Sequence, residues 1–132
     1  MKRWKVINQH RYSYPGRIKM VHYKKGKTLH FDLLGGFVFE HKYDAKKYVR
    51  NCAIPKLKII EVEAIGRGKH IVSCPTDIID ISNYAKNLKG ITIDIKNREH
   101  NYYPGEEIYT LDVQVWLCAK GSMVYPILKV LT

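Results

Sequence analysis

The sequence lacks a dense, even set of cysteines, and this absence argues against a small secreted scaffold. Its three cysteines, Cys52, Cys74 and Cys118, lie far apart, whereas small secreted domains carry closely spaced pairs that form disulfides. We therefore expect reduced thiols. No His or Cys lies at zinc-finger spacing from another, so the sequence predicts no metal site.

Long apolar stretches are also missing. The longest apolar runs are about five residues, whereas a helix that spans a membrane needs roughly 20. The basic residues of Met1–Lys5 are followed by polar residues and not by the apolar segment of a signal peptide. We predict a soluble protein that is not associated with membranes and lies in the cytoplasm, which is the host cytoplasm if the source is viral.

Several short catalytic motifs are absent as well. The chain has no GxSxG nucleophile elbow, no HExxH zinc motif and no GxxxxGK[S/T] phosphate-binding loop. Its six histidines are scattered along the chain. Neither a hydrolase nor a nucleoside triphosphatase is therefore indicated by local sequence.

What the chain does have is an uneven distribution of charge. Its 132 residues suit one domain, and the formal net charge is +11. No acidic residue precedes Asp32, whereas nine basic residues do. The rest of the chain holds 14 basic and 12 acidic residues, which is an ordinary mixed surface. The basic character is therefore concentrated in the first part of the sequence.

The pattern of apolar residues in the first half predicts several strands and one helix. Trp4–Ile7 is expected to form a strand, and residues 18–23 and 28–34 a hairpin around Lys24–Lys27. After the strand Phe37–Phe39, apolar residues at helical spacing predict a helix over Ala45–Cys52, with Lys46, Lys47 and Arg50 on its solvent face. Residues 57–65 and 69–73 then predict a second hairpin or one bent strand.

The second half is richer in predicted strands. A helix is expected between Thr76 and Gly90, or in a shorter form from about Ser82. Alternating isoleucines predict a strand over Ile91–Ile95, paired with the alternating residues 107–119. A last hairpin is expected into residues 123–131, where Pro126 indicates an edge or a bulge. The sequence thus predicts an α+β fold: one compact, mainly antiparallel β domain over residues 1–132 with one or two short helices.

Aromatic residues are interleaved with the basic residues of the first part of the chain. Nucleic-acid-binding proteins use this combination, because cations contact phosphates and aromatic rings stack on bases. Ordinary solvated lysines and an acidic protein partner remain alternatives. The candidate binding residues are Lys2, Arg3, Trp4, Lys5, Arg11, Tyr12, Arg17, Lys19, Tyr23, Lys24, Lys25 and Lys27.

One group of segments resembles the core of ADP-ribosyltransferases of the poly(ADP-ribose) polymerase type. These segments are Gly36–Phe39, the helix with Ala45 and Tyr48, and Ile59–Gly66, about a quarter of the chain. The resemblance implies NAD as a cofactor, contacted by His30 and Phe37, and Glu107 as the catalytic carboxylate. The family's stacking tyrosine falls on Val38, so Phe37 or Phe39 would replace it. The carboxylate would stabilise an oxocarbenium-like sugar as nicotinamide leaves.

The whole chain also resembles short accessory proteins of bacteriophages and other viruses. The matching features are Lys24–Lys27, Gly36–Phe39, Ala45 and Glu61–Glu63, in that order. The sequence therefore predicts a basic accessory protein that binds RNA, single-stranded DNA or an acidic protein surface, needs no cofactor and counters a host defence. The alternatives are an ADP-ribosyltransferase-like enzyme that uses NAD, and a structural or assembly component with no ligand.

Overall fold

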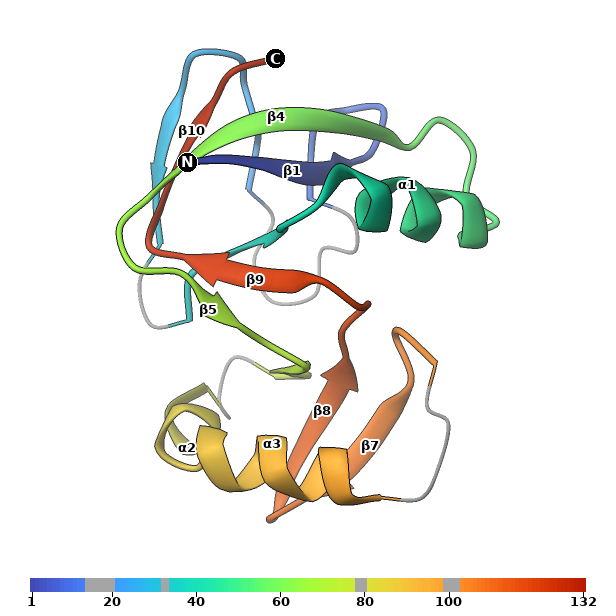
Figure 1. The fold of residues 1–132 in the computed structure, drawn as a ribbon, viewed down its shortest axis with the longest axis vertical. Helices are drawn as coiled ribbons and strands as arrows, with labels where there is room; N and C mark the ends of the chain where they lie inside the picture. Colours follow the sequence, from blue (N-terminus) through green and yellow to red (C-terminus); the bar gives the residue numbers. More distant parts are fainter. Residues whose placement is uncertain (14–20, 32–33, 78–80, 99–102) are drawn as a thin grey trace.

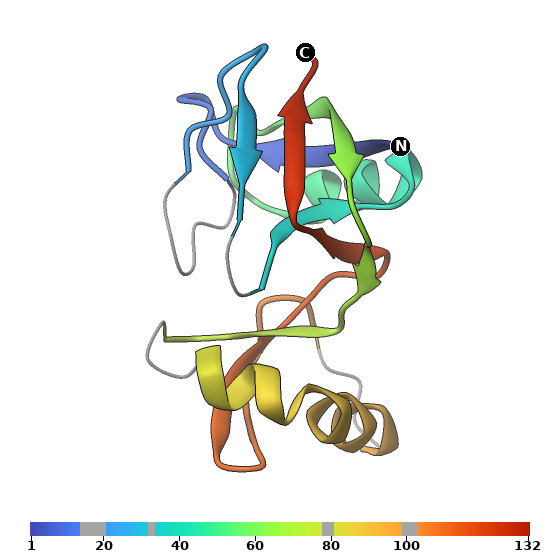
Figure 2. The ribbon, with the colours of Figure 1, turned by 90° about the vertical axis from the view of Figure 1, so that its left-hand side faces the viewer.

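The computed structural model describes residues 1–13, 21–31, 34–77, 81–98 and 103–132. These residues form an α+β fold with antiparallel sheets, as predicted. A seven-stranded sheet lies toward one end of the long axis and a three-stranded sheet toward the other (Figures 1 and 2). No helix in the described part of the chain has the length and apolar character needed to cross a bilayer.

The large sheet has the strand order β2-β10-β4-β1-β3-β9-β5. Its strands are β1 (Lys2–Ile7), β2 (Thr28–His30), β3 (Gly36–Phe39), β4 (Lys58–Ile65), β5 (Lys69–His70), β9 (Ser122–Tyr125) and β10 (Ile127–Val130). The predicted strands at 4–7, 37–39 and 57–65 are therefore confirmed.

One apolar core fills the inner side of this sheet. Along β4, Ile60, Val62 and Ala64 are buried in it, while Glu61 and Glu63 alternate with them on the other side. Buried residues of β1, β2, β3, β9 and β10 belong to the same cluster. In Figure 2, β10 crosses in front of β1, which shows how strongly the sheet twists around this core.

Helix α1 (Lys42–Asn51) covers the opposite side of the central strands. Ala45 is fully buried against Val6 and Phe39, and the ring of Tyr48 lies 5.6 Å from that of Phe39. The backbone N–H of Cys52 bonds to the carbonyl of Tyr48 at 3.1 Å and ends the helix. The predicted helix is confirmed, and its basic residues face the solvent.

The small sheet, of order β6-β8-β7, packs against two helices. Its strands are β6 (Ser73–Pro75), β7 (Glu107–Thr110) and β8 (Val113–Leu117), and the helices are α2 (Ile81–Lys86) and α3 (Leu88–Asn97). Residues 107–119 thus form a hairpin and not one long strand. Leu111 and Asp112 at its turn both have positive φ, 46° and 62°, as a two-residue hairpin turn requires. The shorter predicted helix from about Ser82 corresponds to α2.

The predicted strand over Ile91–Ile95 is wrong, because these residues form the central part of α3. Leu88, Ile91 and Ile95 lie on one helical face that packs against the small sheet, whereas Ile93 is 49% exposed. Arg98 then donates to the Tyr109 carbonyl at 2.8 Å, and Thr110 donates to Asp94. The alternating isoleucines therefore belong to a helix in this protein. With α3 the described residues hold three helices, one more than the upper number predicted.

The hairpin predicted from residues 57–65 and 69–73 and the last predicted hairpin are wrong, because their strands pair with other segments. Strand β2 pairs with β10, β4 pairs with β1 and β10, and β5 pairs with β9. Strands β8 and β9 belong to different sheets. Residues 18–20 of the predicted strand at 18–23 lie outside the described residues, so the first predicted hairpin stays a prediction. Pro126 separates β9 from β10, and three other strands lie between these two in the large sheet. Turn residues indicated where the chain reverses, but not which strands become neighbours.

Candidate functional site

Three exposed cations in the described first part of the chain lie in one tight turn. Lys24, Lys25 and Lys27 are all exposed, and we call Lys24–Lys27 the basic turn. The Lys27 N–H bonds to the Lys24 carbonyl at 3.0 Å, and Gly26 has φ 86°. Two further backbone bonds, Gly26 N–H to Val130 and Val130 N–H to Lys27, fix the turn to β10. These hydrogen bonds fix the position of the basic turn at the end of the large sheet.

Three other predicted cations are engaged inside the protein. The Arg3 Nε donates to the Tyr125 hydroxyl at 3.1 Å, and its guanidinium lies 5.7 Å from the centre of that ring. Arg11 donates to the carbonyls of Tyr23 and Thr132 at 2.7 and 2.6 Å. Lys5 is only 4% exposed. These three side chains contribute to internal structure more than to a free basic surface.

The remaining predicted cations differ in their surroundings. Lys2 is exposed and forms an ion pair with Glu61 at 3.4 Å. Arg17 and Lys19 lie outside the described residues. The basic turn therefore accounts for most of the cations in this part of the chain that the structure leaves available.

Of the predicted aromatic residues, Tyr23 is buried, while Trp4 and Tyr12 are half-buried. Tyr23 is 1% exposed in the main core, and Trp4 packs against α1 and its neighbours. Tyr12 is half-buried, with its ring 5.3 Å from that of the exposed His22. Tyr12 and His22 thus form the described aromatic pair that lies nearest the solvent, whereas Tyr23 has no face free to stack on a base.

A second basic surface follows helix α1. Lys42, Lys46, Lys47 and Arg50 are exposed on it, because the opposite face holds Ala45 and covers the sheet. Helical periodicity indicated most of this face in advance, but the candidate binding residues did not include it.

The residues implied by the ADP-ribosyltransferase resemblance lie on three different strands. His30 is exposed on β2 at one edge of the large sheet, Phe37 is half-buried on β3, and Glu107 is exposed on β7 of the small sheet. The Gln114 side chain donates to the Glu107 carboxylate. Of the three, only Phe37 lines the cavity described next. The enzyme alternative stays a prediction, and the described geometry offers its three residues no common site.

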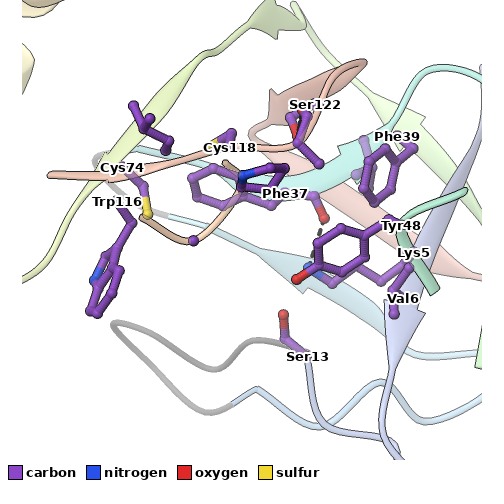
Figure 3. Close-up of a pocket in the computed structure, with 15 residues that line it drawn as sticks. Lys5, Val6, Ser13, Phe37, Phe39, Tyr48, Cys74, Trp116, Cys118 and Ser122 are labelled. Carbon is purple, nitrogen blue, oxygen red and sulfur yellow. Dashed lines mark hydrogen bonds between the residues drawn. The ribbon is translucent and has the colours of Figure 1, made fainter. Parts of the chain in front are cut away.

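A cavity of about 110 Å³ lies where β1 and β3 separate. The two strands pair at Trp4 and Phe39. The cavity is lined beyond that pair by Lys5 and Phe37, and Tyr48 of α1 lines it as well (Figure 3). Residues from β6, β8, β9 and the segment before β7 complete the wall. The site therefore lies between the two sheets and gathers residues from most of the chain.

Lys5 is the basic residue of this wall. Its Nζ donates to the Phe37 carbonyl oxygen at 2.7 Å (Figure 3), and it lies 5.1 Å from the centre of the Tyr23 ring. Lys5 forms no ion pair with any described residue. Burial lowers the pKa of Lys5 to about 7, because a charged amine is poorly solvated there.

Two cysteines also line the cavity, Cys74 and Cys118. Both are free thiols, as is the half-buried Cys52. The hydrogen bond with Cys74 and burial raise the pKa of the Cys118 thiol. Cys118 is therefore a protonated thiol and a poor nucleophile at neutral pH. In the described part of the chain, no three His, Cys, Asp or Glu side chains gather as a metal site.

Sequence patterns did not identify this cavity. Lys5 was predicted as a surface cation, since its neighbours in sequence are basic and aromatic. The one available signal was its place in the alternation of β1, where Lys5 and Ile7 share the inner face.

No family model, curated protein or solved structure matches the chain. The functional argument therefore relies on these residues alone.

Proposed function

We propose that the protein binds the phosphate backbone of single-stranded RNA or DNA through the basic turn, Lys24–Lys27. The observation that carries this proposal is the exposure of three lysines within four residues. None of the three takes part in an ion pair in the described part of the chain. Cations that are not neutralised by nearby carboxylates remain available to phosphate groups.

The nearest cross-strand carboxylates have other partners. On β4, Glu61 pairs with Lys2 and Glu63 with the terminal amine of Met1. In the sheet register, Glu63 also lies opposite Lys129 of β10. These two acids are therefore engaged with Lys2 and the Met1 amine, and neither pairs with a lysine of the basic turn.

The burial of Tyr23 and the partial burial of Trp4 support the mode of binding that we propose. Stacking on aromatic rings gives single-strand binders part of their affinity, and these two rings are held in apolar clusters. We therefore expect contacts to phosphates to dominate, with little preference among bases. The expected signature is a strong dependence on salt.

The test is fluorescence anisotropy with labelled oligo(U) and oligo(dT), titrated between about 50 and 200 mM salt. Replacing Lys24, Lys25 and Lys27 together by Gln should weaken binding and reduce the log–log salt slope by about 2, since each phosphate contact on a single strand contributes roughly 0.7. The loss should be equal for the two oligonucleotides.

Two triple variants with the same change of charge serve as controls. Lys86, Lys89 and Lys96 are exposed on α2 and α3, and replacing them by Gln should leave the slope nearly unchanged. Replacing Lys42, Lys46 and Lys47 of α1 tests the rival basic surface. A larger loss from the α1 variant, or equal losses from all three, would contradict the assignment to the turn. Equal binding to polyglutamate would instead favour an acidic protein partner.

A further inference from the structure

We propose that the cavity between β1 and β3 binds a small aldehyde, which the Lys5 amine captures as a Schiff base. The cavity is separate from the basic turn, so this inference does not depend on nucleic-acid binding. It follows from the placement of a buried amine on the wall of a cavity that is otherwise largely apolar and aromatic.

The size of the cavity limits the ligand. A buried cavity of about 150 Å³ accommodates benzene, and this one measures about 110 Å³. Phe37, Tyr48 and Trp116 contribute aromatic surface to its wall, which favours an apolar tail. An aliphatic aldehyde somewhat smaller than benzene, such as butanal, meets both conditions.

The position of Lys5 supplies the nucleophile. The side chain is 4% exposed, and its Nζ donates one hydrogen bond to the Phe37 carbonyl. It has no carboxylate partner among the described residues, so no ion pair stabilises the charged form there. With a pKa of about 7, a large part of the amine is neutral at neutral pH. An ordinary exposed lysine is neutral in only about one molecule in a few thousand at that pH.

The other titratable groups beside Lys5 or on the wall of the cavity do not compete for the carbonyl. Burial raises the pKa of Tyr23, whose ring lies beside the amine. Cys118 has a raised pKa and shares a hydrogen bond with Cys74, while Tyr48 contributes a phenol from α1. Arg3, on the same side of β1, is engaged with Tyr125. Lys5 is therefore the strongest nucleophile among the described lining residues.

The reaction is a condensation without change of oxidation state. The lone pair of the neutral amine forms a bond to the carbonyl carbon, and one proton of the nitrogen is transferred to the carbonyl oxygen to give a carbinolamine. The nitrogen lone pair then expels the hydroxyl group, which takes up a proton from solvent and leaves as water, and a protonated imine joins Lys5 to the ligand. The Phe37 carbonyl, already 2.7 Å from Nζ, is placed to accept a hydrogen bond from the protonated imine.

The experiment traps the imine on the folded wild-type protein. Butanal and cyanoborohydride are added at pH 7, hydride from cyanoborohydride reduces the imine to a secondary amine, and mass spectrometry with peptide fragmentation locates the adducts. We expect modification of Lys5 to exceed that of the exposed Lys86, Lys89 and Lys96 by at least about tenfold, because of its larger neutral fraction. Fragmentation distinguishes Lys5 from the amine of Met1.

Three controls use the wild-type protein, so they do not depend on whether a variant folds. In urea the preference for Lys5 should disappear, near pH 10 it should shrink as the exposed lysines become neutral, and the bulky 2-naphthaldehyde should show none in the folded protein. The Lys5→Met variant should lose the preferred adduct. Modification of Lys5 no greater than that of Lys86, or a preference that persists in urea, would overturn the proposal.

Discussion

A buried polar side chain at each sheet differs in how fully it is hydrogen-bonded. In the small sheet, the Tyr84 hydroxyl of α2 donates to the Ser73 carbonyl at 2.5 Å and lies 3.2 Å from the Ser73 hydroxyl. In the large sheet, Lys5 is equally enclosed but has one acceptor, the Phe37 carbonyl. Its amine has more hydrogen-bonding capacity than this single bond uses.

The comparison separates a structural polar group from a functional candidate. Buried polar groups are normally satisfied, and an incompletely satisfied one calls for a specific reason. Tyr84 meets the rule, because its hydroxyl joins α2 to β6. Lys5 meets it only in part, and its amine is on the wall of a cavity. The Tyr84 hydroxyl therefore has a structural role, and Lys5 is the residue to which the proposed aldehyde chemistry is assigned.

The largest expected effect tests how the small sheet is supported. Ile91 of α3 is fully buried, and Ile91→Ala should lower the free energy of unfolding by about 2–5 kcal/mol because it leaves a cavity. Ile93 is 49% exposed, so Ile93→Ala should change stability by less than about 0.5 kcal/mol. Urea denaturation measures both. Equal losses would mean that the two isoleucines share the face of a strand, and the description of α3 would then fail.

The next effect concerns the pH dependence of stability at Lys5. The unfolded chain keeps the Lys5 proton to near pH 10, whereas the folded protein loses it near pH 7. Raising the pH between these values therefore favours folding, by up to about 1.4 kcal/mol per pH unit. Relative to Lys5→Met, the wild type should gain about 2.5 kcal/mol between pH 6 and pH 9.

Urea titrations of both proteins at several pH values give this difference directly. The difference between the two proteins cancels the contributions of other groups, including Cys118 and Tyr84, whose pKa values are raised. A difference that stays constant with pH would show that Lys5 keeps its charge in the fold.

The smallest expected effect concerns Tyr84, the buried polar side chain whose hydroxyl is hydrogen-bonded. Tyr84→Phe removes the hydroxyl but keeps the ring, and it leaves the Ser73 carbonyl without this donor. We expect a loss of about 1–2 kcal/mol, the usual cost of an unsatisfied buried group, with no dependence on pH between 6 and 9. Tyr109 is 64% exposed, and Tyr109→Phe is the control. A loss no larger than the control's would show that the hydroxyl does not stabilise α2 on β6.

Local features of the fold were predictable from the sequence. The strands at β1, β3 and β4 and the helix α1 follow from alternating or helical spacing over short segments, and each such pattern survives in the structure. The exception is instructive, because Ile91, Ile93 and Ile95 alternate like a strand while Leu88, Ile91 and Ile95 also fit one face of a helix. Packing against β7 and β8, which no local pattern records, decides between the two.

The cavity was beyond prediction for a different reason. Its wall joins Lys5 to Phe37, Tyr48, Cys118 and Ser122, which are brought together only by the order of strands in the sheet. Charge can be counted along a sequence, but burial cannot, so Lys5 was grouped with the surface lysines. The exposed positions of Lys24 and Lys25 agree with what a glycine-containing turn predicts, since such turns lie at the surface.

The strand order of the large sheet has a consequence for biosynthesis. Strands β9 and β10 follow every other strand along the chain, yet β10 lies between β2 and β4, and β9 between β3 and β5. On the ribosome, the described strands β2 and β5 therefore lack their sheet neighbours until residues 122–130 emerge. Such non-local pairing slows folding and leaves strand edges exposed in the meantime. A nascent chain of this protein thus has to wait for its latest strands, and chaperones that shield strand edges can act during that interval.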